Sequence, residues 1–405
     1  MINNLKLTAC LIVALSTVAA CAQTLSPGVR EDPQAATVTS PVAYVYIAST
    51  PKSSTTNEIV AYTAAANGSL SMVAGSPFRE NVSSMAVNGK YLMASTVSTS
   101  AIDAFKIESD GALSYAASTE YAKYNAPGYL CGIAGQIFFD HSGGTLYVME
   151  YDGTTACAND LYASFEVVKA TGKLTYLGLV STGTFPGAYS AAYFIGDDLY
   201  AYSADDSACM YYGIFGFKRS SNGLLTGLGN ATTNSPTPPA GARSFVPDLA
   251  VADSTNHLAV AMQPANPPGC ASGPMQLATY TADATGKLST TSTAANMPAT
   301  AISSISDMKM APSGELLAIA GKQGLQIFHF NGASPITHYT GLLTSDSIDQ
   351  MFWDNDDHLY AISQASGKLF VFTITPTGYA VAPASPHSIG SPNDIIVQPL
   401  PVYGK

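Results

Sequence analysis

Acidic residues gather in two short stretches of the chain. Glu150 is followed closely by Asp152 and Asp160, and Asp205 is followed directly by Asp206. Carboxylates of this kind can take a proton from water and so act as general bases. They need a partner that stabilises negative charge before hydrolysis becomes effective.

Arg243 and His387 could supply that partner. Glu150 or Asp205 would then activate water, while Arg243 and His387 would stabilise the negative charge that develops on a substrate. These four residues are the candidate catalytic set. The alternative, that all of them are solvated loop residues, stays open, because clustered charges mark functional sites only statistically.

Two other acidic clusters, Asp197-Asp198 and Asp354–Asp357, resemble metal-binding loops at first sight. They lie between expected strands, where Asp and Asn favour turns, and they lack the Gly and the terminal Glu of a calcium loop. A zinc site would need closely spaced Cys or His pairs, which the sequence does not contain. Nucleophile elbows, Walker loops and dinucleotide fingerprints are missing too. We therefore predict no metal and no cofactor.

Four cysteines follow the first 21 residues: Cys131, Cys157, Cys209 and Cys270. An even number in an exported chain indicates two disulfides, and four cysteines allow three pairings. Cys131 and Cys157 bracket one expected hairpin, whereas Cys209 and Cys270 occupy equivalent loops of neighbouring repeats. We expect Cys131–Cys157 and Cys209–Cys270.

The N-terminus has the features of an export signal. Residues 1–20 carry one lysine and an apolar run that ends in small residues, which is typical of a signal peptide. Val18–Cys21 resembles the lipobox of bacterial lipoproteins, so Cys21 is the predicted lipidation site; ordinary cleavage before Gln23 is the alternative. Residues 21–41 are polar and aperiodic, as in a flexible tether. We expect a lipid-anchored protein of the cell envelope, periplasmic or at the outer membrane, or else a secreted one.

The amino-acid composition indicates the fold class and argues against one class of partner. The chain has 405 residues, 47% hydrophobic and only 11% charged, with 34 Gly, 24 Pro and 23 Tyr. This is typical of an all-β protein with many turns. The net charge of −11 and the 17 scattered Lys and Arg residues argue against nucleic acid as a partner, because phosphate binding needs clustered cations. The apolar runs that follow the N-terminal segment are too short to span a membrane, so the only predicted membrane contact is the N-terminal lipid.

A strand–turn–strand pattern recurs seven times, at intervals of 43 to 59 residues. Each copy has a short apolar strand, a third strand with a central aromatic residue, and a turn that contains glycine. The apolar strands are Tyr44–Ala48, Tyr91–Ser95, Leu146–Glu150, Leu199–Ser203, Leu258–Met262, Leu316–Ala320 and Leu359–Ser363. Repeats of this kind predict the four-stranded antiparallel blades of a propeller.

The first strand of each repeat shows how the ring closes. Six copies precede their partners, but none precedes Tyr44, and a seventh copy, Asn393–Gln398, stands alone at the C-terminus. Pairing this strand with the first repeat closes a seven-bladed β-propeller over residues 42–400. Closure also removes two exposed sheet edges, which would otherwise promote aggregation.

The repeats resemble the lactonase-like, YVTN-type propellers, a family that includes bacterial 6-phosphogluconolactonases. The resemblance rests on the Pro312–Leu317 hairpin and on Gly75–Phe78, which is echoed by Ala384–His387. It implies a seven-bladed propeller and, for the enzymes of the family, His- and Arg-containing segments on the inner strands. Here those strands are mostly apolar and contain neither His nor Arg, so no catalytic residue is carried over.

The expected insertions all fall on one face of the ring, where variable loops commonly form ligand sites. We expect a binding or scaffold module that uses this disulfide-braced face, and a monomer. The alternative is a lactonase that hydrolyses a sugar lactone at the channel mouth. The partner would be an unknown protein or a small sugar acid or lactone.

Overall fold

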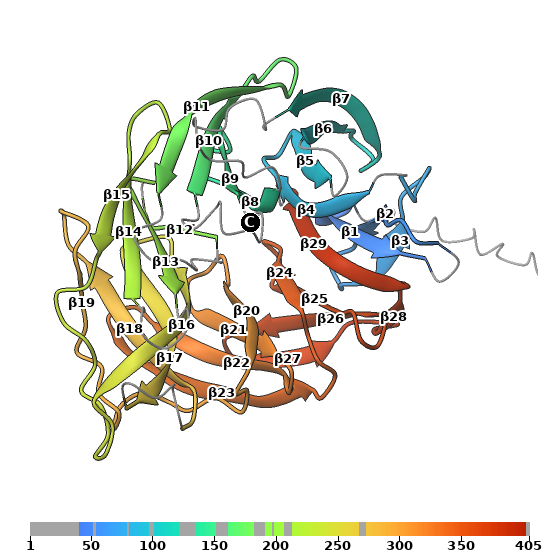
Figure 1. The fold of residues 1–405 in the computed structure, drawn as a ribbon. Coiled ribbons are helices and arrows are strands. Elements are labelled where there is room, and N and C mark those ends of the chain that lie inside the picture. The colour runs from blue at the N-terminus through green and yellow to red at the C-terminus, as the bar shows by residue number, and fades with distance from the viewer. Residues whose placement is uncertain are drawn as a thin grey trace, which may run out of the picture. The chain divides into compact units, whose positions relative to one another are not determined.

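The computed structural model describes residues 40–51, 54–78, 81–96, 101–120, 134–150, 161–181, 191–196, 198–205, 213–266 and 273–401. From Ser40 onward these residues form one compact unit. Its seven antiparallel sheets surround a common centre, each with its first strand innermost (Figure 1). Within the described residues no helix is long and apolar enough to cross a membrane.

Each sheet is one blade, numbered here in chain order. Blade 1 consists of β29 (Ser391–Pro399), β1 (Ala43–Thr50), β2 (Glu58–Ala64) and β3 (Leu70–Met72). Blade 2 consists of β4 (Val82–Val87), β5 (Tyr91–Thr96), β6 (Ala101–Ile107) and β7 (Leu113–Glu120). Blade 3 consists of β8 (Ala134–Phe139), β9 (Thr145–Glu150), β10 (Leu161–Val167) and β11 (Leu174–Ser181). Blade 4 consists of β12 (Tyr193–Phe194), β13 (Tyr200–Asp205), β14 (Gly213–Arg219) and β15 (Leu225–Asn230).

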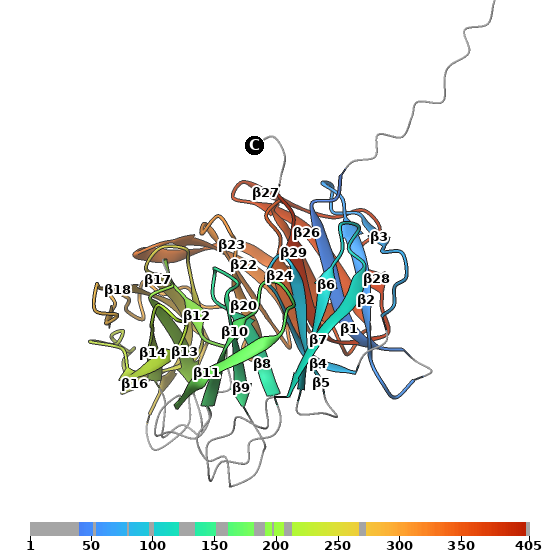
Figure 2. The same ribbon diagram turned by 90° about the horizontal axis from the view of Figure 1, so that it is seen from above.

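The remaining blades follow the same order. Blade 5 consists of β16 (Ser244–Ala252), β17 (His257–Ala265), β18 (Gln276–Ala282) and β19 (Leu288–Ser289). Blade 6 consists of β20 (Ile305–Met310), β21 (Leu316–Gly321), β22 (Gly324–Asn331) and β23 (Ser334–Thr344). Blade 7 consists of β24 (Gln350–Trp353), β25 (His358–Ser363), β26 (Lys368–Thr375) and β27 (Gly378–Val381), and β28 (His387–Ser388) also pairs with β26. Figure 2 shows the same ring turned by 90°.

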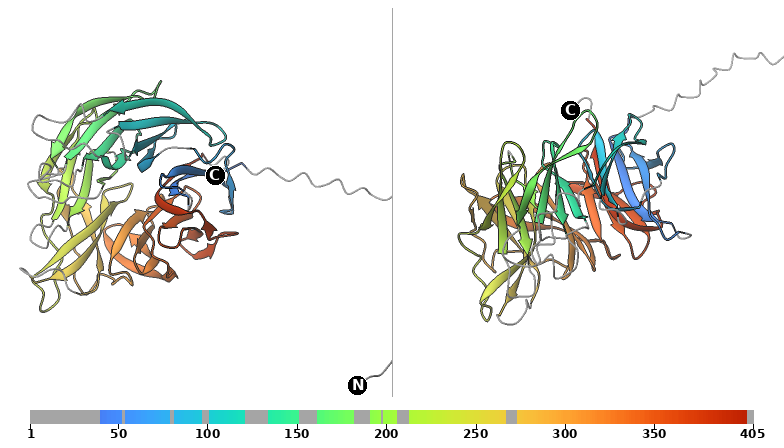
Figure 3. Two further views of the ribbon diagram at one scale, coloured as in Figure 1. Left: turned by 45° about the vertical axis from the view of Figure 1, so that its right-hand side comes forward. Right: turned by 45° about the horizontal axis from the view of Figure 1, so that its top comes forward.

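The predicted seven-bladed propeller and its closure are confirmed. The C-terminal strand β29 pairs antiparallel with β1, from Ala43 opposite Pro399 to Thr50 opposite Ser391. The red and blue ends of the described chain accordingly lie side by side (Figure 3). One inner strand is very short: β12 forms only the pairs Tyr193–Tyr202 and Phe194–Ala201.

The second strand of each blade lies between two neighbouring blades and is therefore apolar on both faces. All six residues of β5, β21 and β25 are buried. Burial on both faces explains why these strands appear in the sequence as continuous apolar runs instead of alternating ones. The central aromatic residues of the third strands add to this core, with Phe165, Phe217 and Phe328 fully buried.

Tyrosines of the second strands tie blades 1, 3 and 4 to the blades that follow them. Their hydroxyl groups donate to glycine carbonyls in the turn between the third and fourth strands of the following blade. These bonds are Tyr46 to Gly111 at 2.9 Å, Tyr147 to Gly223 at 2.7 Å and Tyr202 to Gly286 at 2.9 Å. Blade-to-blade contact therefore involves specific hydrogen bonds as well as apolar packing.

The turn glycines are needed for two reasons. Gly286 has a φ of +79°, which side chains disfavour, and a Cβ there would lie only 2.5 Å from the ring of Tyr200. At Gly111 the φ is +86° and the same contact, with Tyr44, would be 2.6 Å. At these two turns, a tyrosine of the preceding blade packs directly against the glycine.

Candidate functional site in the central channel

A cavity of about 780 Å³ occupies the centre of the ring, and all seven innermost strands contribute to its wall. Pockets of this size accommodate small molecules. The chemistry of the wall therefore depends on which side chains the inner strands direct into it.

Lys309, on β20 of blade 6, is the central cation of this wall. Its Nζ lies 3.0 Å from Oδ1 of Asp307 and donates a hydrogen bond of 2.9 Å to the hydroxyl of Tyr193 in blade 4. The same ammonium lies 5.3 Å from the centroid of the Tyr193 ring, which adds a cation–π contact. To reach blade 4, the side chain passes blade 5, whose inner strand carries the small Ala250 and Ala252.

The environment keeps Lys309 charged. Burial alone would lower its pKa, but the carboxylate of Asp307 and the oxygen of Tyr193 raise the pKa well above its usual value. The lysine side chain is still 22% exposed, so a ligand in the cavity can contact it. The group is a permanent cation at neutral pH, although one with a carboxylate partner.

Asp394, on β29 of blade 1, is shifted by its environment toward its neutral form, whereas Lys309 is kept charged. Its Oδ2 accepts the N–H of Met85 at 2.5 Å, and the side chain of Gln350 also hydrogen-bonds to it. Burial is the dominant effect and raises the pKa of Asp394 to about 7. This carboxyl group is therefore only partly ionised near neutral pH, as a general base or acid needs to be.

Asp394 and Asp307 belong to a repeated structural feature, which we call the latch ring. At the same position of five inner strands, a side-chain oxygen accepts a backbone N–H from the inner strand of the next blade. The pairs are Ser84 with Ile137, Gln136 with Ala191, Asp307 with Met351, Gln350 with Ile395 and Asp394 with Met85. The latch ring thus connects innermost strands that belong to different sheets.

Aromatic side chains line the channel two residues further along the inner strands. Phe138, Tyr193 and Phe352 occupy this level together with Lys309. Phe138 is held by Tyr147, whose ring lies 5.3 Å away at an angle of 26°. Flat apolar faces beside one cation and several carboxyl groups suit a small polyhydroxylated ring.

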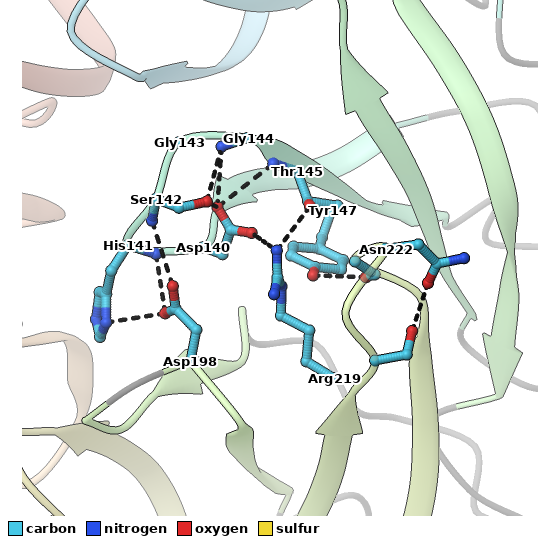
Figure 4. Close-up of polar contacts among 12 residues, drawn as sticks. Asp140, His141, Ser142, Gly143, Gly144, Thr145, Tyr147, Asp198, Arg219 and Asn222 are labelled. Carbon is cyan, nitrogen blue, oxygen red and sulfur yellow. Dashed lines mark hydrogen bonds and ion pairs between the residues drawn. The ribbon is translucent and has the colours of Figure 1, made fainter.

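The end of the channel formed by the tight turns carries a separate polar cluster, shown in Figure 4. Arg219 donates to Oδ2 of Asp140 at 2.6 Å, and Oδ1 of Asp140 accepts the hydroxyl of Ser142 at 2.8 Å. Beside it, Nδ1 of His141 lies 2.9 Å from Asp198, and the hydrogen bond that His141 donates to Asp198 raises the pKa of His141 despite its partial burial. These contacts join the hairpins of blades 3 and 4.

The described residues of the acidic turns accept hydrogen bonds from backbone N–H groups. Oδ1 of Asp354 accepts the backbone N–H groups of Asp356 and His358, at 2.8 and 2.9 Å. Asp198 accepts the N–H groups of His141 and Ser142. The described residues contain no group of three or more His, Cys, Asp or Glu side chains that could hold a metal.

Two of the four candidate catalytic residues can be placed relative to this channel site. Arg243 is exposed just before β16, and His387 is half-buried in β28; neither lines the cavity. Glu150 and Asp205 end strands β9 and β13, but the positions of their side chains lie outside the description. Their proposed roles stay predictions.

The predicted disulfides and the lipidation site are not tested either. Cys21, Cys131, Cys157, Cys209 and Cys270 all lie outside the described residues. The two pairings and the lipid anchor therefore stay predictions.

The sequence did contain a signal for the channel residues. In five of the seven inner strands the latch residue stands at the same place, but as Ser, Gln or Asp. A search of the inner strands for histidine and arginine does not detect a position that is occupied by Ser, Gln or Asp. Lys309 stands two residues after Asp307 in a strand whose other residues are Ile, Ser and Met.

No family model matches the sequence, and no curated protein matches it. Solved structures do. The periplasmic gluconolactonase PpgL of Pseudomonas aeruginosa is 12% identical, with a TM-score of 0.63 over 89% of this chain and 99% of that one. A Bacteroides fragilis protein provisionally named 6-phosphogluconolactonase is 13% identical, with a TM-score of 0.59 over 88% and 98% of the two chains.

The chain has the fold of the lactonase-like propellers. At such low identity the likeness concerns the fold alone, and function has to be argued from the site. Kuenenia stuttgartiensis hydrazine synthase, for example, also matches, with 13% identity and a TM-score of 0.50 over 78% of this chain and 90% of that one. The resemblance stated from the sequence is confirmed at the level of architecture.

Proposed function

We propose that this protein hydrolyses a small sugar lactone inside the central channel. The observation that carries the proposal is that Asp394, with a pKa of about 7, and the cationic Lys309 line the same cavity. Lactone opening needs a base that is ionised near neutral pH and a positive group for the developing oxyanion. Those two requirements are met by residues of the inner strands.

In the proposed reaction the Asp394 carboxylate takes a proton from water, and the water oxygen attacks the lactone carbonyl carbon. The resulting oxyanion is stabilised by the ammonium of Lys309 and the hydroxyl of Tyr193, which lie 2.9 Å apart. The ring C–O bond then breaks, and the leaving alkoxide recovers the proton from Asp394. The product is the open-chain hydroxy acid.

The test is proton release from glucono-δ-lactone, corrected for spontaneous opening. Asp394→Asn keeps an oxygen for the N–H of Met85 but cannot act as a base, so we expect a loss of roughly 10²–10⁴-fold in kcat. Turnover of the wild type should rise as the pH passes about 7. Asp253→Asn, which removes a buried carboxylate of a blade 5 turn, is the matched control and should retain turnover.

A wild type without turnover above the spontaneous rate would contradict the proposal. So would an Asp394→Asn variant that turns over like the control. In the first case binding without catalysis becomes the better description. One observation favours that second candidate: Asp394 is already engaged by Met85 and Gln350 in the latch ring.

Location is part of the proposal. We propose that the protein is exported and held at the cell envelope by a lipid on Cys21, since the N-terminal segment has the features of a lipoprotein signal. Cys21→Ser should move the protein from the membrane fraction to the soluble fraction, because a single lipid would be its only anchor. A soluble wild type that begins at Gln23 would contradict the anchor.

A further inference from the structure

We propose that the channel selects neutral or cationic ligands over anionic ones, and that Asp307 sets this preference. The inference rests on the proposed function only in taking the channel as the ligand site. It concerns which charge a ligand can carry, and it holds whether or not the ligand is turned over.

The single permanent cation among the described lining residues already has a carboxyl partner, whose own pKa is raised by burial. Nζ of Lys309 lies 3.0 Å from Oδ1 of Asp307, which is 11% exposed and shares the same strand. Its remaining hydrogen-bonding contact is the neutral hydroxyl of Tyr193. An incoming anion would therefore meet an ion pair and not a free ammonium group.

The other charges of the channel wall do not favour an anion. Asp140 is paired with Arg219, and His141 is paired with Asp198, so both are compensated locally. Asp349 and Asp394 also line the cavity; neither forms a salt bridge with a described side chain, although the charge of Lys309 acts on Asp394 from a distance. Their contacts are backbone or amide groups, such as the N–H of Gln364 on Asp349 at 2.6 Å.

Carboxylates at the wall of a partly closed cavity repel a like charge more strongly than they would in water, because the effective dielectric constant is lower there. A phosphate group would bring about two negative charges toward Asp349 and Asp394. Hydroxyl groups can instead donate to these carboxylates, and an ammonium group would be attracted. The expected order of affinity is amino sugar, neutral sugar, sugar phosphate.

Three stable probes of the same ring size separate these cases: glucosamine, glucose and glucose 6-phosphate. Titration calorimetry at pH 7.5 and low ionic strength should give glucose 6-phosphate a Kd at least ~10-fold weaker than that of glucose. Salt at about 0.15 M should narrow the difference, because it screens the repulsion.

Asp307→Asn tests whether Asp307 sets the charge preference of the channel. The amide oxygen can still accept the N–H of Met351, while Lys309 loses its carboxylate, so binding of glucose 6-phosphate should improve relative to glucose by ~10-fold or more. Lys309→Met should do the opposite and favour glucosamine further. Asp253→Asn changes the net charge equally, away from the cavity, and should leave the order unchanged.

Equal or tighter binding of glucose 6-phosphate by the wild type would overturn the inference, and so would failure to bind any of the three probes. An Asp307→Asn variant with the wild-type order would also overturn the role of Asp307. Wild-type binding in the expected order, without lactone opening, would overturn the proposed hydrolysis and leave this inference standing.

Discussion

At the scale of single residues, the latch ring places the carboxyl group of Asp394 where burial disfavours its charge. Asp394 must present an oxygen to the N–H of Met85, which any carbonyl or carboxyl oxygen can do. It must also remain in a site where burial disfavours its charge. The other latch residues include Ser84, Gln136 and Gln350, which are neutral and carry no such penalty.

The raised pKa of Asp394 predicts how stability depends on pH. Its pKa is about 7 in the folded protein, whereas an unfolded Asp titrates near pH 4. Between these values the folded state binds more protons than the unfolded state, so the free energy of unfolding falls as pH rises. Asp394→Asn removes this effect, which is on the order of 4 kcal/mol when complete.

Urea unfolding of both proteins at pH 4, 5.5, 7 and 8 measures the difference. The variant should gain stability relative to the wild type as the pH rises, and the gain should level off above about pH 7. Two curves that run parallel across this range would show that Asp394 titrates normally.

Prediction from sequence fails for these residues for two physical reasons. The latch position needs only a hydrogen-bond acceptor, so Ser, Gln and Asp replace one another and leave no single-letter repeat. Lys309 and Tyr193 are 116 residues apart and come from blades that are not neighbours. Only the closed ring brings them together, and no local pattern records that proximity.

At the scale of strands and turns, the sequence is much more informative. A strand buried on both faces has to be continuously apolar, and a hairpin turn with positive φ nearly always needs glycine. Both requirements are local, and the chain repeats them in every blade. For this reason β1, β5 and β9 were predicted within a few residues of their bounds.

Gly286 and Gly314 allow the two roles of a turn glycine to be separated. Both have positive φ, +79° and +72°, but only Gly286 faces the neighbouring blade, where a Cβ would lie 2.5 Å from Tyr200. Gly314→Ala should cost about 1 kcal/mol through backbone strain alone. Gly286→Ala should cost about 1–3 kcal/mol more, because the Tyr200 ring has to move.

Thermal or urea unfolding of the two alanine variants provides the comparison. Tyr200→Leu combined with Gly286→Ala is the second control, because it should recover part of the loss if the contact is the cause. Equal destabilisation by the two single alanine substitutions would show that the packing between blades contributes nothing at this turn.

At the scale of the whole molecule, the ring depends on pairing between the two ends of the described chain. β29 supplies the inner strand of blade 1, and Asp394 and Gln350 connect that strand to blades 2 and 7. Blade 1 therefore holds the first and last described strands in one sheet. The channel wall, including the proposed base, exists only when this sheet has formed.

Deletion of residues 391–405 should consequently destabilise the whole ring and not only blade 1. The truncated chain would lose the pairing of β29 with β1, expose the edge of β1 and break the latch ring on both sides. We expect a fall in Tm of 10 °C or more, or failure to yield soluble protein, since about 1 kcal/mol shifts the Tm of a large domain by roughly 2–4 °C.

Deletion of residues 402–405 alone is the control for truncation itself, and calorimetry of the three proteins gives the result. Adding residues 391–401 as a separate peptide should restore part of the lost Tm in a concentration-dependent way, because the peptide would bind only the folded ring. A Tm of the 391–405 deletion equal to that of the control would show that the propeller is stable without its closing strand.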